Sequence, residues 1–277
     1  MLRDYLPVVL EDKIDDFRIK GGDMETRSID FTGKTALVTG GSRGLGLAIA
    51  AALAGRGAQV GICGRKQENL DAAVRELDSR GLKVFAQSAH LGKTAQVDAL
   101  FKAVRNSFGR LDILINNVGM NLPTPSVAEL DEGLWDKIIE GNLKSAFLAS
   151  RRAVALMKGQ GGGRIVNISS IAARKAAPGM GVYCVAKAGL EMFTRVLAKE
   201  VAVAKISVNA VAPGMIRTRF SKPFWENQDL LSDLTAAIPM GRIAETGDVV
   251  GAVLFLCSSW AEYITGEVVT VDGGAMA

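Results

Sequence analysis

The sequence predicts a doubly wound α/β fold, a single domain in which a seven-stranded parallel sheet carries helices on both faces. From Lys34 onward, short β-branched apolar runs alternate with longer helical patterns, as in proteins built on parallel sheets. The runs are almost continuously apolar, which is typical of strands buried on both faces. The 277 residues fit one large domain, and 31 glycines against 7 prolines suit tight turns between strands and helices.

The elements can be placed in chain order from this pattern. The expected strands are Thr35–Thr39, Gln59–Cys63, Lys83–Gln87, Leu111–Ile115, Arg164–Ile168, Ile206–Val211 and Val268–Val271. The helical patterns cover roughly residues 45–56, 67–79, 94–108, 131–157, 182–203 and 247–258.

Two segments stand apart from this alternation. Residues 1–30 form an N-terminal extension to the domain at 31–277, and a short amphipathic helix built on Val9, Ile14 and Phe17 is one interpretation of it. Residues 215–240 form a long connection rich in large apolar side chains. Because long connections inside a compact domain usually serve function, we expect a substrate lid there, with subunit packing as the alternative.

Composition excludes several classes of function. The net charge of +4 is small and scattered, which argues against nucleic acid as a partner. Cys63, Cys184 and Cys257 lack the spacing of metal ligands and His90 is the single histidine, so we expect neither a metal site nor a disulfide framework. No run approaches eighteen apolar residues and no secretory signal is recognisable, so we expect a cytoplasmic protein that does not enter a membrane.

A glycine-rich segment follows the first expected strand and opens a helix. Glycines let the backbone approach a pyrophosphate, and the helix N-terminus offers free N–H groups and partial positive charge. A simple strand-to-helix turn is the alternative. The candidate cofactor-binding residues of this loop are Gly40, Ser42, Arg43, Gly44, Leu45 and Gly46.

Two arginines indicate which dinucleotide would bind. Arg43 lies at the helix N-terminus, where a cation is disfavoured unless an anion is also present. Arg65 follows the second strand, whose tip is Gly64, and no carboxylate comes before Glu68. Paired guanidiniums suit a 2′-phosphate, so we expect NADP(H); two solvated surface arginines are the alternative.

A tyrosine and a lysine suggest acid–base chemistry. Tyr183 precedes Lys187 by four residues, which places both side chains on one helix face, and Ser170 lies thirteen positions upstream. A free phenol has a pKa of about 10, and a nearby ammonium would lower it. We therefore expect Lys187 to make Tyr183 a usable acid near neutral pH.

Seven segments together resemble the short-chain dehydrogenase/reductase family over about residues 31–277. They are the glycine-rich loop, Asn116-Asn117-Val118-Gly119, Asn142, Ser170, Tyr183-x3-Lys187, the segment from Pro213 to Thr218, and Val271-Asp272-Gly273-Gly274. The resemblance implies a Rossmann fold with strand order 3-2-1-4-5-6-7. It also implies hydride transfer between a nicotinamide and a carbonyl or alcohol carbon.

The same resemblance implies a role for each site residue. Tyr183 would be the general acid or base, Ser170 would hold the substrate oxygen, Lys187 would also grip the nicotinamide ribose, and Asn142 would support a water that links Lys187 to solvent. From the residues alone, Ser170 could instead be a helix cap and Asn142 a buried polar group satisfied within its helix. Cofactor contacts are implied for Asn117, Gly119, Pro213, Gly214, Ile216 and Thr218, the last two around the carboxamide.

Several alternatives remain open at this stage. The expected substrate is a small carbonyl or alcohol, with 3-oxoacyl carrier-protein reduction as an alternative and a non-catalytic cofactor sensor as another. His90 stands where relatives usually carry Asp, and either an adenine contact or a plain loop histidine fits. Members of the family are usually homotetramers, so we expect one here.

Overall fold

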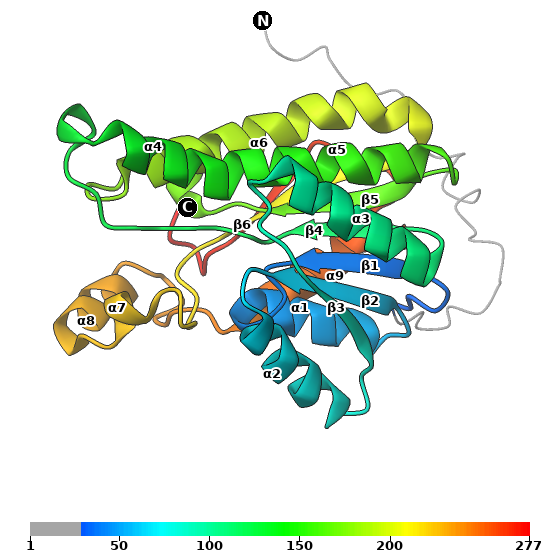
Figure 1. Ribbon diagram of the computed structural model, residues 1–277. Helices are drawn as coiled ribbons and strands as arrows, with labels where there is room; N and C mark the ends of the chain where they lie inside the picture. The colour runs from blue at the N-terminus through cyan, green and yellow to red at the C-terminus, as the bar shows by residue number, and fades with distance from the viewer. Residues whose placement is uncertain (1–28) are drawn as a thin grey trace, which may run out of the picture.

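Seven parallel strands form one sheet in the order β3-β2-β1-β4-β5-β6-β7, which confirms the predicted topology (Figure 1). The computed structural model describes residues 29–277; the helix suggested around Val9, Ile14 and Phe17 lies outside this range. The strands are β1 (Thr35–Thr39), β2 (Gln59–Gly64), β3 (Val84–Ser88), β4 (Ile113–Asn116), β5 (Gly163–Ile168), β6 (Ile206–Pro213) and β7 (Val268–Val271).

Helices cover both faces of the sheet, as Figure 1 shows. Neighbouring residues of β1 explain why: Leu37 and Val38 are both fully buried, yet they join different apolar clusters. One cluster packs under α1, α2 and α9, and the other packs under α3, α5 and α6. The helices are α1 (Gly44–Ala54), α2 (Gln67–Asp78), α3 (Thr94–Phe108), α4 (Glu132–Ile139), α5 (Ser145–Lys158), α6 (Gly181–Val201), α7 (Lys222–Trp225), α8 (Gln228–Ala236) and α9 (Thr246–Cys257).

The strand order reverses between β1 and β4, and this reversal positions the site. β1 pairs with β2 on one side and with β4 on the other, so the connections leaving β1 and β4 run to opposite faces. In open parallel sheets, ligands bind at such a switch point, beyond the carboxyl ends of the strands.

Two expected elements differ from the structure. The helix expected over 131–157 is interrupted by a π-helical turn at Glu140–Lys144, between α4 and α5. The connection at 215–240 contains two helices, α7 and α8, which the sequence pattern did not predict. They lie at the end of the sheet where the chain leaves β6 (Figure 1).

Candidate active site

The glycine-rich loop joins β1 to the N-terminus of α1. Gly40 and Gly44 have φ values of 64° and 54°, in the left-handed region that glycine adopts without strain. Arg43 occupies the N-cap position and makes no side-chain cap, and no acidic residue lies in the first turn. The N–H groups that open α1 are therefore left for another acceptor, and the helix dipole favours an anion there.

Asn117 and Thr39 fix this loop against the end of β4. The backbone N–H of Asn117 donates to Thr39 Oγ1 at 2.9 Å, and Asn117 Nδ2 donates to the carbonyl oxygens of Thr39 and Gly40 at 3.0 and 3.2 Å. A Cβ on Gly46 would lie only 2.3 Å from the Gly40 carbonyl oxygen. Asn117 thus fixes the loop against the end of β4, and the close approach at Gly46 leaves no room for a side chain there.

Arg43 lies at the N-terminus of α1, which follows β1, and Arg65 directly follows the neighbouring strand β2. Arg43 and Arg65 are both exposed, and within residues 29–277 neither guanidinium forms an ion pair. A Cβ on Gly64 would lie 3.3 Å from Ser42 Oγ, so the tip of β2 lies against the loop. The structure therefore places two exposed guanidiniums, neither ion-paired among residues 29–277, at the glycine-rich loop and just after the tip of β2, and that tip is Gly64 rather than a carboxylate.

Tyr183 and Lys187 lie side by side in the first turns of α6. Both side chains are buried, with 8% and 3% of their surface exposed. Lys187 Nζ is 5.6 Å from the centre of the Tyr183 ring and donates a hydrogen bond of 2.8 Å to the Ile168 carbonyl oxygen at the end of β5. The i, i+4 spacing thus produces the proximity that the sequence predicted.

The pKa of Tyr183 moves opposite to the expected direction. Burial raises this pKa to about 12, the Ser170 hydroxyl opposes the rise, and neighbouring Cys184 adds to it. Burial also lowers the pKa of Lys187 to about 8. The low-dielectric surroundings therefore disfavour the charged form of each group.

Ser170 and Asn142 surround this pair. Ser170 caps a 3-10 turn at Ile171–Ala173 by accepting from Ala172 N at 3.2 Å, so the capping alternative is realised together with its influence on Tyr183. Asn142 is fully buried in the π-helical turn. Its Nδ2 donates to the carbonyl oxygens of Met120 and Ile138 at 2.7 and 2.9 Å, and its Oδ1 accepts from Met120 N at 3.1 Å. The side chain of Asn142 thus forms one hydrogen bond within its own helical segment, to Ile138, and two to Met120 in the segment that follows β4.

Gly119 lies directly against Asn142 and Lys187. It is exposed, and a Cβ there would lie 3.2 Å from Asn142 Oδ1 and 3.5 Å from Lys187 Nζ. Any side chain at this position would cover Lys187. An uncapped N-terminus at α1 and a glycine beside Lys187 are features that could serve the pyrophosphate and the nicotinamide half of a dinucleotide.

The segment after β6 lies between the segment that follows β7 and the glycine-rich loop. β6 ends at Pro213, and a Cβ on Gly214 would lie 3.1 Å from Asp272 Cα, so the chain passes close to the segment that follows β7. Thr218 reaches the phosphate loop: a Cβ on Gly44 would lie 3.6 Å from Thr218 Cβ. Ile216 pairs with Ala244 in an isolated bridge.

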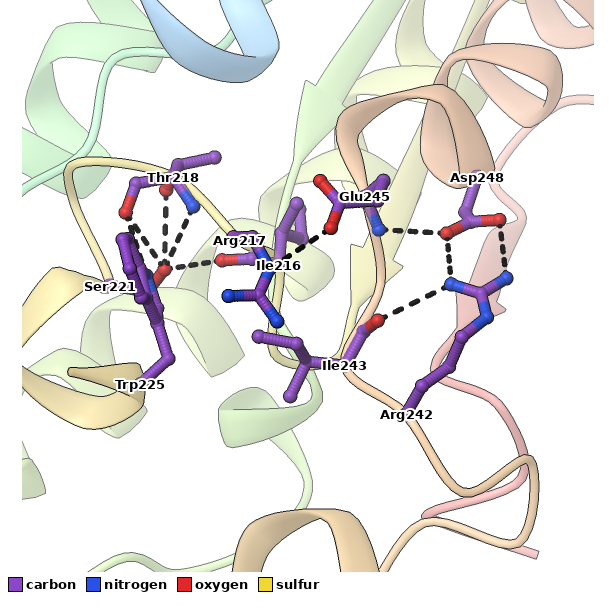
Figure 2. A network of polar contacts seen from close by, with 9 residues as sticks. All are labelled: Ile216, Arg217, Thr218, Ser221, Trp225, Arg242, Ile243, Glu245 and Asp248. Carbon is purple, nitrogen blue, oxygen red and sulfur yellow. Dashed lines mark hydrogen bonds and ion pairs between the residues drawn. The ribbon is translucent and has the colours of Figure 1, made fainter. Parts of the chain in front are cut away.

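Figure 2 shows a polar network around Thr218 that the sequence did not predict. Ser221 and Trp225, at the beginning and end of α7, both hydrogen-bond to the Thr218 backbone, and Arg217 pairs with Glu245 at 3.0 Å. The available signal was a serine three residues after Thr218, at the start of a helix too short to show periodicity.

The structure also bears on His90, on membrane-spanning helices and on metal sites. His90 Nδ1 accepts from Gly92 N at 3.2 Å, so one ring nitrogen is used within its own loop. Over residues 29–277, no helix has the length and apolar character needed to cross a membrane. The same range contains no group of three or more His, Cys, Asp or Glu side chains placed to hold a metal ion.

Comparisons with known proteins agree with this architecture. Residues 40–276 match a family model described as Enoyl-(Acyl carrier protein) reductase. The chain is 40% identical over 250 residues to Dehydrogenase/reductase SDR family member 4 of Oryctolagus cuniculus, covering 90% of this chain and 96% of the relative. The human protein of that name is 39% identical over 249 residues, covering 90% of each chain.

Solved structures of similar fold also match the chain. A short-chain type dehydrogenase/reductase from Mycobacterium ulcerans superposes with a TM-score of 0.86 at 32% identity, covering 89% of this chain and 91% of that one. A doubly wound sheet with a glycine-rich loop at its switch point defines a class of dinucleotide-dependent oxidoreductases. The chain belongs to the short-chain dehydrogenase/reductase family, whose members use nicotinamide cofactors.

Proposed function

We propose that this protein is an NADP(H)-dependent oxidoreductase that transfers a hydride between the nicotinamide and a carbonyl or secondary-alcohol carbon. The observation that carries the proposal is the buried pair of Tyr183 and Lys187 beside the exposed Gly119. The cofactor supplies or accepts the hydride, so the protein must orient the reactants and move one proton.

Tyr183 provides that proton in the reductive direction. Its raised pKa keeps the phenol protonated across neutral pH, which is the form that can donate to a carbonyl oxygen as negative charge develops there. The Ser170 hydroxyl, held by its cap to Ala172, hydrogen-bonds the same oxygen. In the oxidative direction the same group would act as the base, in its phenolate form.

Lys187 and Asn142 serve the cofactor and the proton supply. Held by the Ile168 carbonyl, Lys187 Nζ has further N–H donors for the ribose hydroxyls. Asn142 fixes Met120 and the π-helical turn beside Lys187, and this supports a water-linked path from Lys187 to solvent. Asn142 acts on backbone geometry, because both hydrogens of its amide are already donated.

The preference for NADP(H) rests on Arg43 and Arg65. Both guanidiniums lie at the edge of the phosphate loop without a carboxylate partner among residues 29–277, and both can bind a 2′-phosphate through paired hydrogen bonds.

The substrate is a small carbonyl compound with an apolar body. This part of the proposal rests on α7, α8 and the segment around them, which carry large apolar side chains such as Phe220 and Leu230, 54% and 46% exposed. A thioester bound to acyl carrier protein is the second candidate, favoured by the description of the matching family model. A non-catalytic cofactor sensor is disfavoured because such proteins need neither Tyr183 nor Lys187.

We also propose that the protein is a homotetramer. Val185, Met192 and Val196 lie along one face of α6 and are 47%, 57% and 47% exposed, and Phe147 on neighbouring α5 is 43% exposed. An apolar stripe of this kind across two adjacent helices is suited to burial against a second copy.

Initial rates with purified protein test the proposed activity. The panel combines NADPH and NADH with apolar ketones, sugar acids and 3-oxoacyl thioesters. We expect NADPH-dependent reduction of at least one ketone, with kcat/KM at least about tenfold higher for NADPH than for NADH. Binding of NADPH without turnover of any carbonyl would instead support the sensor, and a preference for NADH would refute the cofactor assignment.

A further inference from the structure

Ser221 is buried within a segment whose other side chains are largely exposed, with only 6% of its surface accessible. Four polar atoms surround its hydroxyl: the carbonyl oxygens of Ile216 and Thr218, the Thr218 backbone N–H, and Thr218 Oγ1 (Figure 2). A serine hydroxyl has one hydrogen to donate and two lone pairs with which to accept. The arrangement therefore determines which partner receives that hydrogen.

The hydrogen of Ser221 is left for the Ile216 carbonyl oxygen. The Thr218 carbonyl oxygen already accepts from Ser221 N at 3.2 Å and from Trp225 Nε1 at 3.1 Å, which uses both of its lone pairs. The Ile216 carbonyl oxygen is also the nearer of the two to Ser221 Oγ. Ser221 therefore donates to Ile216.

The oxygen of Ser221 then accepts two hydrogens from one residue. Thr218 N donates to it at 3.2 Å, and Thr218 Oγ1 lies 3.3 Å away. Since Ser221 has no second hydrogen, the Thr218 hydroxyl must be the donor in this second contact. The Thr218 oxygen consequently has only lone pairs to present to any other group.

We infer that Ser221 is a positioning residue that makes Thr218 a pure hydrogen-bond acceptor toward the cofactor site. The Thr218 side chain lies beside Gly44 at the start of α1, where its Cβ and methyl carbon are each 3.6 Å from a Cβ built on Gly44. Because the Thr218 hydrogen is donated to Ser221, any group that bonds to the Thr218 oxygen must itself carry an N–H or O–H donor. The primary amide of a nicotinamide has such donors, and a carbonyl or ether oxygen would be repelled. The inference rests on the proposed function only in requiring a nicotinamide cofactor, with or without the 2′-phosphate.

Trp225 and Arg217 anchor this arrangement to the rest of the protein. The Arg217 guanidinium lies 5.2 Å from the centre of the Trp225 ring, and it pairs with Glu245, the N-cap residue of α9, at 3.0 Å. The indole N–H thus keeps the Thr218 carbonyl occupied while its ring is held from the other side. These contacts connect the short helix α7 to α9, next to the position of Thr218.

Cofactor analogues test this assignment by binding rather than by turnover. The parent protein and its variants are titrated by calorimetry with NADP⁺ or NAD⁺, whichever the parent binds more tightly, and with the matching 3-acetylpyridine analogue. The analogue replaces the amide –NH₂ by a methyl group and so lacks the donor. We expect the parent to bind the amide form about tenfold more tightly. Ser221→Ala should reduce this preference to less than about threefold, because the Thr218 hydroxyl then becomes free to rotate.

Three further variants separate positioning from folding. Ser221→Thr keeps the hydroxyl and should restore the preference. Ser232→Ala removes an exposed hydroxyl from α8 and should leave the preference unchanged. Trp225→Phe keeps the ring but frees the Thr218 carbonyl, so it should weaken the preference in part. Thermal unfolding of each variant shows whether the fold is retained.

The outcomes distinguish this inference from the proposed function. A folded Ser221→Ala variant that keeps the full preference of the parent would overturn the role of Ser221, while reduction of ketones by the parent would leave the proposed function intact. Failure of the parent to bind either dinucleotide would overturn both.

Discussion

Lys187 Nζ lies 2.8 Å from the Ile168 carbonyl oxygen and 5.6 Å from the centre of the Tyr183 ring. The end of β5 therefore holds the ammonium against the face of the Tyr183 ring. Both side chains are buried, so each is less readily charged than in water. Burying ionisable side chains in this way lowers the stability of the folded protein, a cost that is common at functional sites.

The stability cost of Lys187 should appear in the pH dependence of unfolding. Its pKa is lowered by burial from 10.5 to about 8, so between these values the unfolded chain binds a proton that the folded chain does not. The contribution of Lys187 to the free energy of unfolding therefore rises with pH across this window. Below it, both states are protonated and the buried ammonium costs about 3 kcal/mol.

Lys187→Met lacks this titration. The stability of the variant minus that of the parent should fall by about 3 kcal/mol as the pH rises from 8 to 10.5, measured by urea unfolding without cofactor. Tyr183 is common to both proteins, so its own titration cancels in the difference. Lys199→Met, an exposed position on the same helix, is the control and should show a difference independent of pH. A pH-independent difference for Lys187→Met as well would show that Lys187 titrates normally.

Arg65 should determine the choice between the two nicotinamide cofactors. Arg65→Ala removes a guanidinium from the tip of β2, and we expect kcat/KM with NADPH to fall about tenfold or more while the value with NADH stays within about twofold. The comparison is made by initial rates on one ketone. Lys66→Ala, next to it and paired with Glu68 at 3.5 Å, should leave the ratio of the two values nearly unchanged. Equal losses with both cofactors would indicate a structural role for Arg65.

The sequence predicted the features of this protein that depend on repeated local patterns. All seven strands were predicted, because buried parallel strands are nearly continuous apolar runs. Their order in the sheet was expected from the resemblance to the short-chain dehydrogenase/reductase family, which the loop motifs carry. The proximity of Tyr183 and Lys187 follows from helical spacing alone. The interruption at Glu140–Lys144 was not predicted, because the π-helical turn is stabilised by the tertiary contacts of Asn142 with Met120.

Features that depend on the surroundings of a residue were harder to predict. The direction of the pKa change of Tyr183 depends on burial, and the sequence shows only the charged neighbour. The role of Ser221 depends on which carbonyl oxygens are already occupied, and Trp225 contributes through a single N–H. Helix α7 has four residues, too few to show a period.

The apolar face of α6 should mediate assembly. Met192→Glu places a charge on the most exposed residue of this face and should shift the protein toward smaller species, measured by sedimentation velocity. Leu230→Glu changes an exposed apolar residue on α8 in the same way and should leave the sedimentation coefficient unchanged. A Met192→Glu protein with the sedimentation profile of the parent would exclude this face as an interface.

Comparison of Tyr183→Phe with the parent tests the central claim most directly. The substitution removes only the phenolic hydroxyl, so NADPH should still bind with nearly the affinity of the parent in a calorimetric titration. The rate of ketone reduction in a single turnover should fall at least about a hundredfold, which is the usual contribution of a positioned general acid. If Tyr183→Phe instead reduces the ketone at the rate of the parent with unchanged NADPH affinity, Tyr183 is not the proton donor.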